Sequence, residues 1–395
     1  MFYIGIDVAK NKHDCCILKH NLEEVSLFTF TNDKAGFDKL MLEISRFSKE
    51  THFSDIKIGL ESTGHYSTNL TNYLLQKRLS VKIYNPLLVS LKVKADSLRK
   101  TKTDKSDCRF LARLTMTEES KPYIQPVSSV SELKILTRNR HRLVAQRSKL
   151  KLSLSRLVTI VFPELPELVY SVNQKSSYAL LLEYPTASAI ANAHLTKLTN
   201  VLHSNSKGKY TRDKALEIRK VAENSIGFNS FATGFELQQT IRLIQNVSLE
   251  ISLLDNKIKE IMSEIDSPIL SIPGIGYVLG AIILSEIGDV RNFQNPAKLL
   301  KFAGLEPSVY ESGKFKASST SIVKRGSKYL RWALLQATRL VAIRDETFKA
   351  YMAKKISEGK HFFVAQGHVS KKLVRVIFSL LKNSTPFQPS SILAT

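Results

Sequence analysis

The chain has 395 residues, of which 58 are Lys or Arg and 35 are Asp or Glu, so its formal net charge is +23. A protein with this surplus usually binds phosphate backbones, and nucleic acid is therefore the expected partner. The three cysteines have no C-x-x-C spacing, which argues against a disulfide framework and favours a reducing, cytoplasmic setting, and no apolar run approaches the roughly 18 residues of a membrane span.

The N-terminal region alternates strands with helices, which predicts an α/β sheet layer. The chain opens with a β-hairpin, in which a strand from Tyr3 and a second strand, Asp14–Leu18, flank a tight turn. A polar stretch through Asn32 then follows. The later elements are an amphipathic helix near Phe37–Ser48, a strand Ile56–Leu60, a helix Asn69–Lys77 and a strand Val81–Ile83.

Four acidic residues of this region are candidates for a metal site. Asp7 lies within an apolar strand and Glu61 directly follows one, and a carboxylate in such a place is costly without a compensating cation or hydrogen bond. Asp104 and Asp107 are three residues apart, so a helix would carry both on one face. Because the histidines are scattered and form no zinc cluster, hard oxygen ligands favour Mg²⁺, with Mn²⁺ as an alternative. Together the four carboxylates could bind one or two ions and hold a phosphate, whereas each alone could equally be a solvated or helix-capping group.

Two basic stretches favour contact with a phosphate backbone. Residues 92–113 surround the last two carboxylates with cations, and residues 131–156 are strongly basic against the single acid Glu132. The contacts expected are made by Lys100, Lys102, Lys105 and Arg109 in the first stretch and by Arg138, Arg140, Arg142 and Arg147 in the second. A solvated helix face is the alternative for the second stretch, and its lack of interleaved aromatic residues favours duplex backbone over stacked single-stranded bases there.

From about residue 129 the pattern changes to long helices, the first over Val130–Val161 and a later one over Phe235–Ile265. In the later helix an apolar residue recurs every seven positions, at Leu237, Ile244, Ile251 and Ile258, which predicts a coiled coil or a helix pair with a role in dimerisation. An ordinary buried helix face is the alternative. Residues 171–227 are also helical, but they carry no set of residues with an assigned chemistry.

The expected domains are an α/β domain over residues 1–128, a helical connector over 129–265, a mainly α-helical C-terminal domain over 266–385 and a tail over 386–395. In the C-terminal domain, a turn through Gly274 and Gly276 precedes an apolar helix. Such a turn either forms a helix-hairpin-helix loop, whose backbone N–H groups meet a phosphate, or simply connects two helices.

Three acidic motifs resemble those of a known family. They are YIGIDVAK at residues 3–10, GLESTG at residues 59–64 and KTDKSD at residues 102–107, and they are similar in kind and order to the motifs of the IS110-type, or DEDD, transposases. The first domain of that family has a RuvC-like ribonuclease H fold. The resemblance therefore implies that Asp7, Glu61, Asp104 and Asp107 are metal-binding carboxylates.

The C-terminal region resembles the same family through LSIPGIG at residues 270–276 and FAGLEP at residues 302–307. In the family's C-terminal domain a serine before a glycine is the nucleophile, and ESGK at residues 311–314 aligns with it, which implies Ser312. Cations at Lys314, Lys324 and Arg325 could neutralise a phosphate near this hydroxyl. By residue chemistry alone, Ser308 and the hydroxyl run at residues 318–321 are rivals.

The resemblance as a whole implies a DNA recombinase that moves an insertion sequence. Its serine would attack a DNA phosphate and form a covalent phosphoserine link, with Mg²⁺ held by the carboxylates. The partners implied are donor and target DNA, a structured noncoding guide RNA, and further copies of the chain, as a dimer and as a tetramer in the synaptic complex. The setting implied is the prokaryotic cytoplasm, at the nucleoid during action, with no membrane partner.

Three other functions fit some of these residues. A RuvC-like nuclease or Holliday-junction resolvase would use water as the nucleophile and leave Ser312 structural. A non-catalytic nucleic-acid-binding protein would use the carboxylates only as caps and surface charges. An actin-like ATPase also opens with a Gly-Ile-Asp strand, but the expected glycine-rich phosphate loop does not follow.

Overall fold

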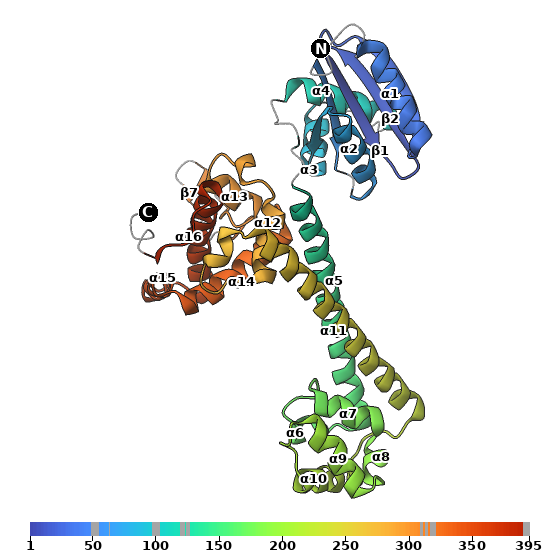
Figure 1. Cartoon of the computed structure of the whole chain (residues 1–395), viewed down its shortest axis with the longest axis vertical. Coiled ribbons are helices and arrows are strands. Elements are labelled where there is room, and N and C mark those ends of the chain that lie inside the picture. The colour runs from blue at the N-terminus through green and yellow to red at the C-terminus, as the bar shows by residue number, and fades with distance from the viewer. Residues whose placement is uncertain are drawn as a thin grey trace. The chain divides into compact units, whose positions relative to one another are not determined.

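The computed structural model describes residues 1–48, 55–62, 64–96, 103–118, 123, 127–308, 311–312, 315–316 and 321–389. The chain divides into two compact units, Met1–Gln125 and Pro126–Thr395 (Figure 1). Among the described residues, none of the helices combines the length and the apolar composition that a membrane crossing requires.

The first unit is built on one five-stranded sheet with the strand order β3-β2-β1-β4-β5. Antiparallel pairing joins the first three strands in the chain, and parallel pairing joins β1 to β4 and β4 to β5. The strands are β1 (Phe2–Val8), β2 (Lys12–Lys19), β3 (Glu24–Thr31), β4 (Ile56–Glu61) and β5 (Ser80–Tyr84). The expected mixed α/β layer is confirmed. Strand β3 was missing from the prediction, because the polar residues around it hide its alternation.

Helices cover both faces of this sheet. The helices are α1 (Lys34–Ser48), α2 (Tyr66–Gln76), α3 (Pro86–Asp96) and α4 (Asp104–Thr117). Apolar residues of α1 and α2 join the core that includes Ile4 and Ile6 of β1, whereas α4 packs with Cys16 and Leu18 of β2. Because strand side chains alternate between faces, Gly5 and Asp7 share the face that α4 covers.

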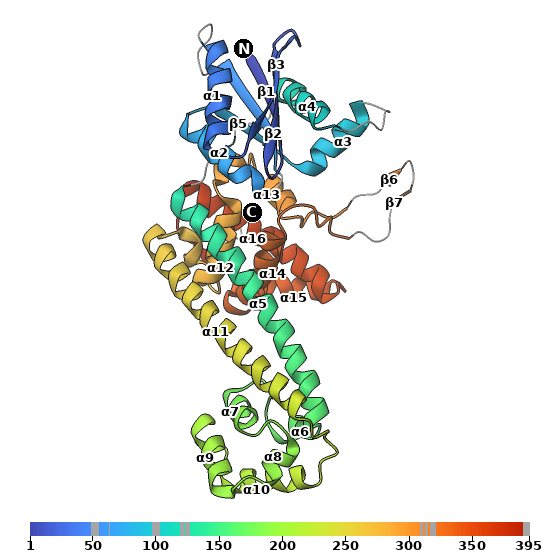
Figure 2. The ribbon, with the colours of Figure 1, turned by 90° about the vertical axis from the view of Figure 1, so that its right-hand side faces the viewer.

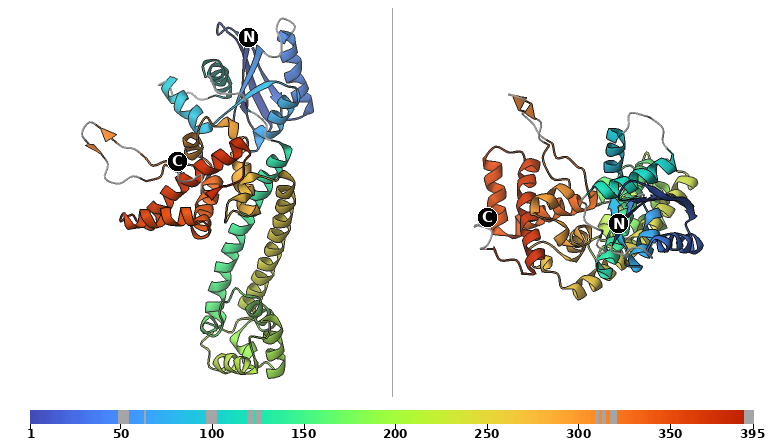
Figure 3. Two further views of the ribbon diagram at one scale, coloured as in Figure 1. Left: turned by 60° about the vertical axis from the view of Figure 1, so that its left-hand side comes forward. Right: turned by 90° about the horizontal axis from the view of Figure 1, so that it is seen from above.

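In the second unit two long helices, α5 (Ser128–Val161) and α11 (Phe231–Ile265), lie side by side and run in opposite directions (Figure 3). Two ion pairs at corresponding positions show the direction: Arg140 pairs with Asp255, and Arg156 pairs with Glu236. The residues of the expected heptad seam, Leu237, Ile244, Ile251 and Ile258, are all buried. The seam is therefore largely used within the chain, in the pairing of α11 with α5.

The chain between these two helices forms a small helical region, which we call the tip. It contains α6 (Leu165–Leu168), α7 (Lys175–Glu183), α8 (Ala187–Ala191), α9 (Leu195–Asn205) and α10 (Arg212–Glu223). Its core continues into the ends of the long helices, since Leu157 of α5 and Ile241 of α11 belong to the same apolar cluster as Leu198 and Ile218.

The other end of the long pair packs into a C-terminal helical body. Its elements are the 3₁₀ turns η2 (Pro268–Ser271) and η3 (Val290–Asn292), and α12 (Tyr277–Ile287), α13 (Pro296–Phe302), α14 (Lys328–Arg344), α15 (Glu346–Ser357) and α16 (Phe362–Asn383). Two short strands, β6 (Glu311–Ser312) and β7 (Phe315–Lys316), pair with each other and stand away from these helices (Figure 2). The expected mainly α-helical C-terminal region is confirmed.

Candidate metal and nucleic-acid site

The strands of the first unit bring acidic residues to one edge of one sheet face. Asp7 is near the end of β1, and Glu61 ends the neighbouring parallel strand β4, one position beyond the paired residues Ile6 and Leu60. Asp7 and Glu61 both follow a glycine of their own strand at a distance of two residues, so both point toward the face that α4 covers. Adjacent strand ends therefore place the two carboxylates side by side.

Helix α4 supplies the other two acids from its first turn. Thr103 caps this helix: its Oγ1 accepts a hydrogen bond from Ser106 N at 3.2 Å, and Ser106 Oγ accepts one from Thr103 N at 3.0 Å. This reciprocal cap fixes where the helix starts, and it leaves Asp104 and Asp107 in the first helical turn. Carboxylates at that position are also stabilised by the helix dipole.

Two glycines let α4 approach the sheet closely enough to deliver these acids. A Cβ on Gly5 of β1 would overlap the carbonyl oxygen of Cys108 and the backbone nitrogen of Ala112. A Cβ on Gly59 of β4 would overlap the hydroxyl of Thr115. Helix α4 thus rests on the bare backbone of two adjacent strands, and its N-terminal turn reaches the strand ends.

Asp7 is the electrostatic centre of this arrangement. Burial raises the pKa of Asp7 to about 6, and so do the negative charges around it, which are those of Asp107, Asp104, Glu61 and Asp14. Charges act on a pKa in this way only at short range. All four acids predicted from the sequence are therefore electrostatic neighbours in the folded chain.

A fifth acid, Asp14, was not predicted. It is paired with Asp7 across β1 and β2, and it is buried, with Thr29 Oγ1 donating a hydrogen bond to its Oδ1 at 2.6 Å. The signal was present in the hairpin register, since an acid in β2 opposite Asp7 must lie on the same face. Lys12 Nζ lies 4.0 Å from Asp14 Oδ2 and 3.9 Å from Asp104 Oδ2, so one ammonium group bridges the two carboxylates.

The residues of this cluster suit a divalent metal ion of the oxygen-preferring kind. Their donors are all carboxylate oxygens, and the raised pKa of Asp7 records an excess of negative charge that a cation would relieve. Across the described part of the chain, no three His, Cys, Asp or Glu side chains are gathered closely enough to enclose an ion by themselves. An Mg²⁺ site needs no such enclosure, since one or two carboxylates, water and substrate phosphates usually complete it.

The basic residues that were predicted to contact a phosphate beside these acids have different surroundings in the structure. Arg109 of α4 is engaged within the chain, since its Nε and Nη2 donate to the carboxylate of Glu24 at 2.6 and 3.1 Å. Lys105, one residue after Asp104, is exposed. Lys100 and Lys102 lie outside the described residues. Of the four predicted cations, Lys105 is therefore the one that the structure describes as exposed and without a carboxylate partner, whereas the cation that contacts the acidic cluster is Lys12.

The arginines of α5 divide into structural and exposed groups. Arg138 pairs with the buried Glu286 of α12 at 2.6 and 3.0 Å, and Arg140 pairs with Asp255 of α11. These two guanidinium groups hold the long helices and the C-terminal body together. Arg142 is exposed, with a hydrogen bond to Asn139 at 3.3 Å, and Arg147 is half-buried.

The predicted nucleophile Ser312 lies in the β6–β7 hairpin of the second unit. Its backbone pairs with Phe315, while its side chain lies outside the described part of the chain. A ladder anchors the hairpin's base: Ser308 N donates to Ser321 O at 2.8 Å, and Val323 N donates to Glu306 O at 2.9 Å. The rival Ser308 thus lies in the pairing at the base, whereas Ser312 lies in the short strand β6. Lys314 and the rival run at residues 318–320 also lie outside the described residues.

Other predicted contacts flank this hairpin. Lys324 and Arg325 are exposed and follow its second strand, and the carbonyl of Lys324 accepts a hydrogen bond from Arg331 Nη1 at 3.0 Å. Gly276 is the N-cap of α12 and is exposed, with open space where a side chain would be. Gly274 has φ +98, and a Cβ there would crowd Leu340 of α14. The turn is therefore built around glycine, and its exposed residue is the one at the helix N-terminus.

Comparison with known proteins gives matches at both ends of the chain. The family model of the IS110-type DEDD proteins, described as a transposase, matches residues 4–163. The model of the transposase IS116/IS110/IS902 family matches residues 266–353. The first match spans the acidic cluster, and the second spans the hairpin that carries Ser312.

Several relatives are similar over nearly the whole chain. A protein of insertion element IS116 from Streptomyces clavuligerus is 25% identical, with 98% of this chain and 96% of that protein covered. The pilin gene-inverting protein of Moraxella bovis is 27% identical, covering 98% and 97% respectively. The mini-circle putative transposase for IS117 from Streptomyces coelicolor is 24% identical, covering 79% and 78%.

Proposed function

This chain belongs to the IS110 family of transposases, and from that premise we propose that it cuts and rejoins donor and target DNA through a covalent phosphoserine intermediate on Ser312. It is a DNA transposase or recombinase of an insertion sequence, and the family depends on divalent metal. The observation that carries the proposal is the acidic cluster of β1, β2, β4 and α4, in which burial and four carboxylate charges raise the pKa of Asp7.

The strand order of the first unit supports a RuvC-like ribonuclease H fold. Three antiparallel strands followed by two parallel strands, in the order β3-β2-β1-β4-β5, place the ends of β1 and β4 at the centre of the sheet. In such a sheet the acids gather where the central strands end. Asp7 and Glu61 stand at that point, and α4 adds Asp104 and Asp107.

In the proposed site, Asp7, Glu61, Asp104 and Asp107 would hold Mg²⁺, and Mn²⁺ would be a substitute. When bound, the ion would neutralise charge on a DNA phosphate. Asp7 is partly buried, and the charges of the other three acids act on it. Lys12 counterbalances Asp14 and Asp104, which limits how much net negative charge the incoming phosphate meets.

The proposed chemical step belongs to Ser312. Its Oγ attacks the phosphorus of one DNA phosphodiester, the Oγ–P bond forms, and the bond from phosphorus to one sugar oxygen breaks. The leaving sugar oxygen takes up the proton that the serine loses. In the rejoining step, a sugar hydroxyl of the other DNA attacks the phosphoserine and releases Ser312. The phosphodiester bond is thus exchanged and not hydrolysed.

The proposed partners are donor DNA, target DNA, a noncoding guide RNA and further copies of the chain. The net charge of +23 supports contact with several nucleic-acid strands at once. Lys105, Arg142, Arg147, Lys324, Arg325 and the exposed N-terminus of α12 at Gly276 supply the described contacts of this proposal. Assembly of several copies, as a dimer and a tetramer, would unite carboxylates and serine from different protomers.

The experiment is a strand-exchange assay with the element's end DNA, its flanking noncoding RNA and Mg²⁺, resolved on denaturing gels that retain protein–DNA adducts. Wild type is compared with Asp7→Ala, Ser312→Ala and the matched control Ser308→Ala. We expect adducts and recombinants from wild type and Ser308→Ala, and neither product from the other two variants.

Each other outcome identifies a different function. Cleavage without an adduct in Ser312→Ala would mean that water is the nucleophile and that the chain is a nuclease or junction resolvase. If the adducts vanish in Ser308→Ala, the nucleophile is Ser308 and not Ser312. Recombination that proceeds without the RNA would remove the guide from the proposal and leave the serine chemistry in place.

A further inference from the structure

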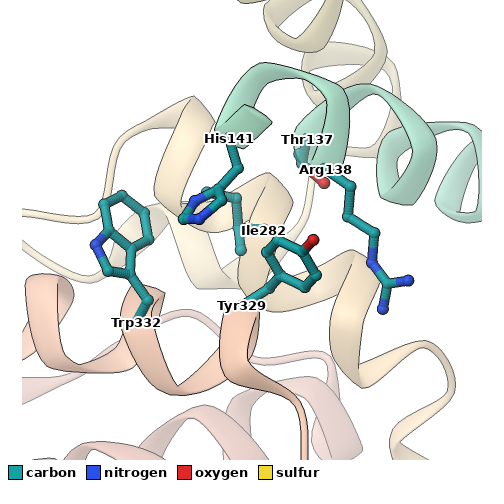
Figure 4. Close-up of a pocket in the computed structure, with 6 residues that line it drawn as sticks. All are labelled: Thr137, Arg138, His141, Ile282, Tyr329 and Trp332. Atoms are coloured by element: carbon teal, nitrogen blue, oxygen red, sulfur yellow. The ribbon is translucent and has the colours of Figure 1, made fainter. Parts of the chain in front are cut away.

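Three helices of the second unit enclose a small hollow that the proposed function does not use. It lies between α5, α12 and α14 and is lined by Thr137, Arg138, His141, Ile282, Tyr329 and Trp332 (Figure 4). The part of this space beside Arg138 and Tyr329 is too narrow for a water molecule. The open part, of about 140 Å³, lies farther along α5, where Arg140, Val144 and Ala145 line it together with Thr137, His141, Ile282 and Trp332. We call this space the Trp332 hollow.

Aromatic rings form the walls of the Trp332 hollow. The imidazole of His141 meets the ring of Tyr329 edge-on, with centroids 5.1 Å apart, and the indole of Trp332 edge-on, with centroids 5.6 Å apart. Tyr329 and Trp332 are three residues apart on α14, so they rise from one face of that helix toward α5 (Figure 4). Trp332 is 37% exposed, so a flat ligand can approach it from solvent.

Cations stand around these rings. The guanidinium of Arg138 lies 4.9 Å from the centre of the Tyr329 ring, and Lys328 Nζ lies 5.2 Å from it. Arg138 is fixed there by the buried carboxylate of Glu286, while Lys328 is exposed and has no ion pair with a carboxylate among the described residues. The hollow therefore joins aromatic surface to positive charge, which is the combination that binds nucleobases with their phosphates.

His141 adds a polar edge to the hollow. Burial and the nearby charges of Lys328 and Arg140 lower the pKa of His141, which keeps its ring neutral near pH 7. A neutral imidazole offers one donor and one acceptor nitrogen. In the part of the chain that the structure describes, neither nitrogen of His141 has a hydrogen-bond partner. The floor is apolar, because Ile282 is buried beneath the rings.

The size of the hollow limits its ligand. Pockets for whole cofactors and drug-sized molecules are usually about 300–1,000 Å³, and this one is well below that range. One flat heterocycle fits such a space better than a dinucleotide or a peptide side-chain cluster. The basic sequence of α5 has no aromatic stripe of its own, and the rings come from α14, nearly two hundred residues later, so only the fold brings rings and cations together.

We propose that the Trp332 hollow binds a single unpaired nucleobase, stacked on the indole of Trp332, edged by His141 and with its phosphate beside Lys328. The inference rests on the proposed function only in requiring that the chain binds nucleic acid. The base belongs to a single-stranded segment, either of an RNA partner or of a displaced DNA strand, since stacking serves both chemistries. The Trp332 hollow shares no residue with the acidic cluster or with the β6–β7 hairpin.

The test uses the fact that Trp332 is the only tryptophan in the chain. The full chain is titrated with three short oligonucleotides of equal length: a single strand, the same strand with abasic positions, and a blunt duplex. Indole fluorescence reports on the hollow, and the anisotropy of a dye on the oligonucleotide reports on total binding. We expect quenching by the single strand and little quenching by the abasic strand or the duplex. Matched RNA and DNA strands show which source is preferred.

Variants check the same site without relying on indole emission. We expect Trp332→Ala to weaken single-strand binding about 5- to 100-fold and duplex binding hardly at all, which is the range for the loss of one stacked base. Trp332→Phe keeps a ring and should retain most of the affinity. Phe363→Ala, which removes a side chain that is 67% exposed elsewhere on the same unit, is the matched control and should change nothing.

Two results would overturn the inference, and each has a different consequence for the proposed function. If all three oligonucleotides bind by anisotropy but the abasic strand quenches as much as the intact strand, the hollow holds no base and the proposed function stands. If no oligonucleotide binds at all, the nucleic-acid function fails and the hollow's role fails with it. Because the abasic comparison is made on wild type, a variant that misfolds cannot obscure either result.

Discussion

Asp7 lies in an environment that opposes its charge in the absence of a cation. It is partly buried between the sheet and α4, and four other carboxylates lie near enough to raise its pKa to about 6. Folding therefore works against the ionised Asp7 near pH 7, and the chain tolerates this cost at one position. A residue that destabilises its own fold while it keeps a reactive group in place is typical of a functional site.

The first prediction concerns the loss of stability that the ionised Asp7 causes. We expect Asp7→Asn to abolish strand exchange while leaving the free energy of unfolding unchanged or raising it by about 1–3 kcal/mol, because the repelled charge is gone. We also expect Mg²⁺ to raise the melting temperature of wild type and to have much less effect on Asp7→Asn. Thermal unfolding with and without Mg²⁺ measures both effects.

Asp38→Asn is the matched control, because Asp38 is an exposed acid of the same unit that contributes no charge to the Asp7 environment. It should keep both activity and the response to Mg²⁺. An equal Mg²⁺ response in wild type and Asp7→Asn would show that the ion binds elsewhere.

Residue chemistry predicted Asp7, Glu61, Asp104 and Asp107 as a group. Asp7 interrupts an apolar strand and Glu61 follows one, while Asp104 and Asp107 are spaced to share one face of a helix. It did not predict Asp14, whose role depends on which residue of β1 it faces. It also did not separate Arg109 from Lys105, since only the fold shows that Glu24 engages the arginine. Pairings between distant residues are set by tertiary structure, and sequence spacing does not record them.

At the scale of single elements, the position of α4 depends on the bare backbone of two strands. The helix rests on Gly5 and Gly59, where any side chain would overlap its backbone or Thr115. A helix displaced outward would carry Asp104 and Asp107 away from Asp7 by the same amount. The two glycines thus set the spacing of the acidic cluster, although neither has a reactive group.

The second prediction follows from this contact. We expect Gly5→Ala to lower the free energy of unfolding by about 1–3 kcal/mol, as overpacking does, and to reduce strand exchange more than that loss explains. Gly367→Ala is the control, because a Cβ on Gly367 in α16 meets nothing within 4 Å. Denaturant unfolding and exchange assays measure both variants. Unchanged activity and stability in Gly5→Ala would show that α4 can shift without consequence.

The third prediction concerns the junction of α12 with α5 and α14. Burial alone would raise the pKa of Glu286, but hydrogen bonds from Arg138 and Ser327 and the charge of Lys134 outweigh it and lower the pKa. Ser327, the N-cap of α14, donates to Glu286 at 2.7 Å. One carboxylate therefore ties three helices together. We expect Glu286→Gln to lower the free energy of unfolding by about 2–3 kcal/mol at pH 7.

The pH dependence of this effect has a definite sign. Because the pKa of Glu286 is lower in the folded state than its ordinary value of 4.5, the folded state binds fewer protons. The stabilisation is complete above that value and is lost as the pH falls through the folded-state pKa. Urea unfolding of wild type and Glu286→Gln should therefore converge in acid. A gap that stays constant down to the lowest pH would mean that packing, and not charge, accounts for the difference.

At the scale of the whole chain, the sequence predicted a mixed α/β N-terminal region and a mainly helical C-terminal region, and both are confirmed. The α/β region follows from strands such as the one through Ile4 that alternate with helices, and the long helix α11 follows from the heptad of which Leu237 is part. The elements that were missed lack a clean period: β3 is only half-buried along most of its length. The Trp332 hollow could not be predicted either, because its rings and its arginines come from helices that are distant in sequence.

The fourth prediction concerns self-association. The heptad residues of α11 are buried in the pairing with α5, but Leu249 and Leu253, one helical turn apart, are 60% and 54% exposed. Such a pair is the apolar surface that a second copy would cover. We expect Leu249→Glu with Leu253→Glu to reduce the mass measured by light scattering without changing the helix content.

Gln239→Glu with Ser263→Glu is the matched control, because it adds the same charge to exposed polar positions of the same helix, each nearly three turns along the helix from the leucine pair. It should leave the mass unchanged. A wild-type chain that is already monomeric, or a leucine variant that keeps the wild-type mass, would place the contact between copies elsewhere.

The tip is an insertion between the two long helices of the second unit. Its two ends lie next to each other, because Phe228 N, shortly before α11, donates a hydrogen bond at 2.8 Å to Ile160 O, near the end of α5. A segment with adjacent ends can be exchanged, shortened or enlarged without rethreading the rest of the protein. Only its inner lining is constrained, because any replacement must cover Leu157 and Ile241. A change in the length or sequence of the tip can therefore leave the C-terminal helical body of the same unit as it is.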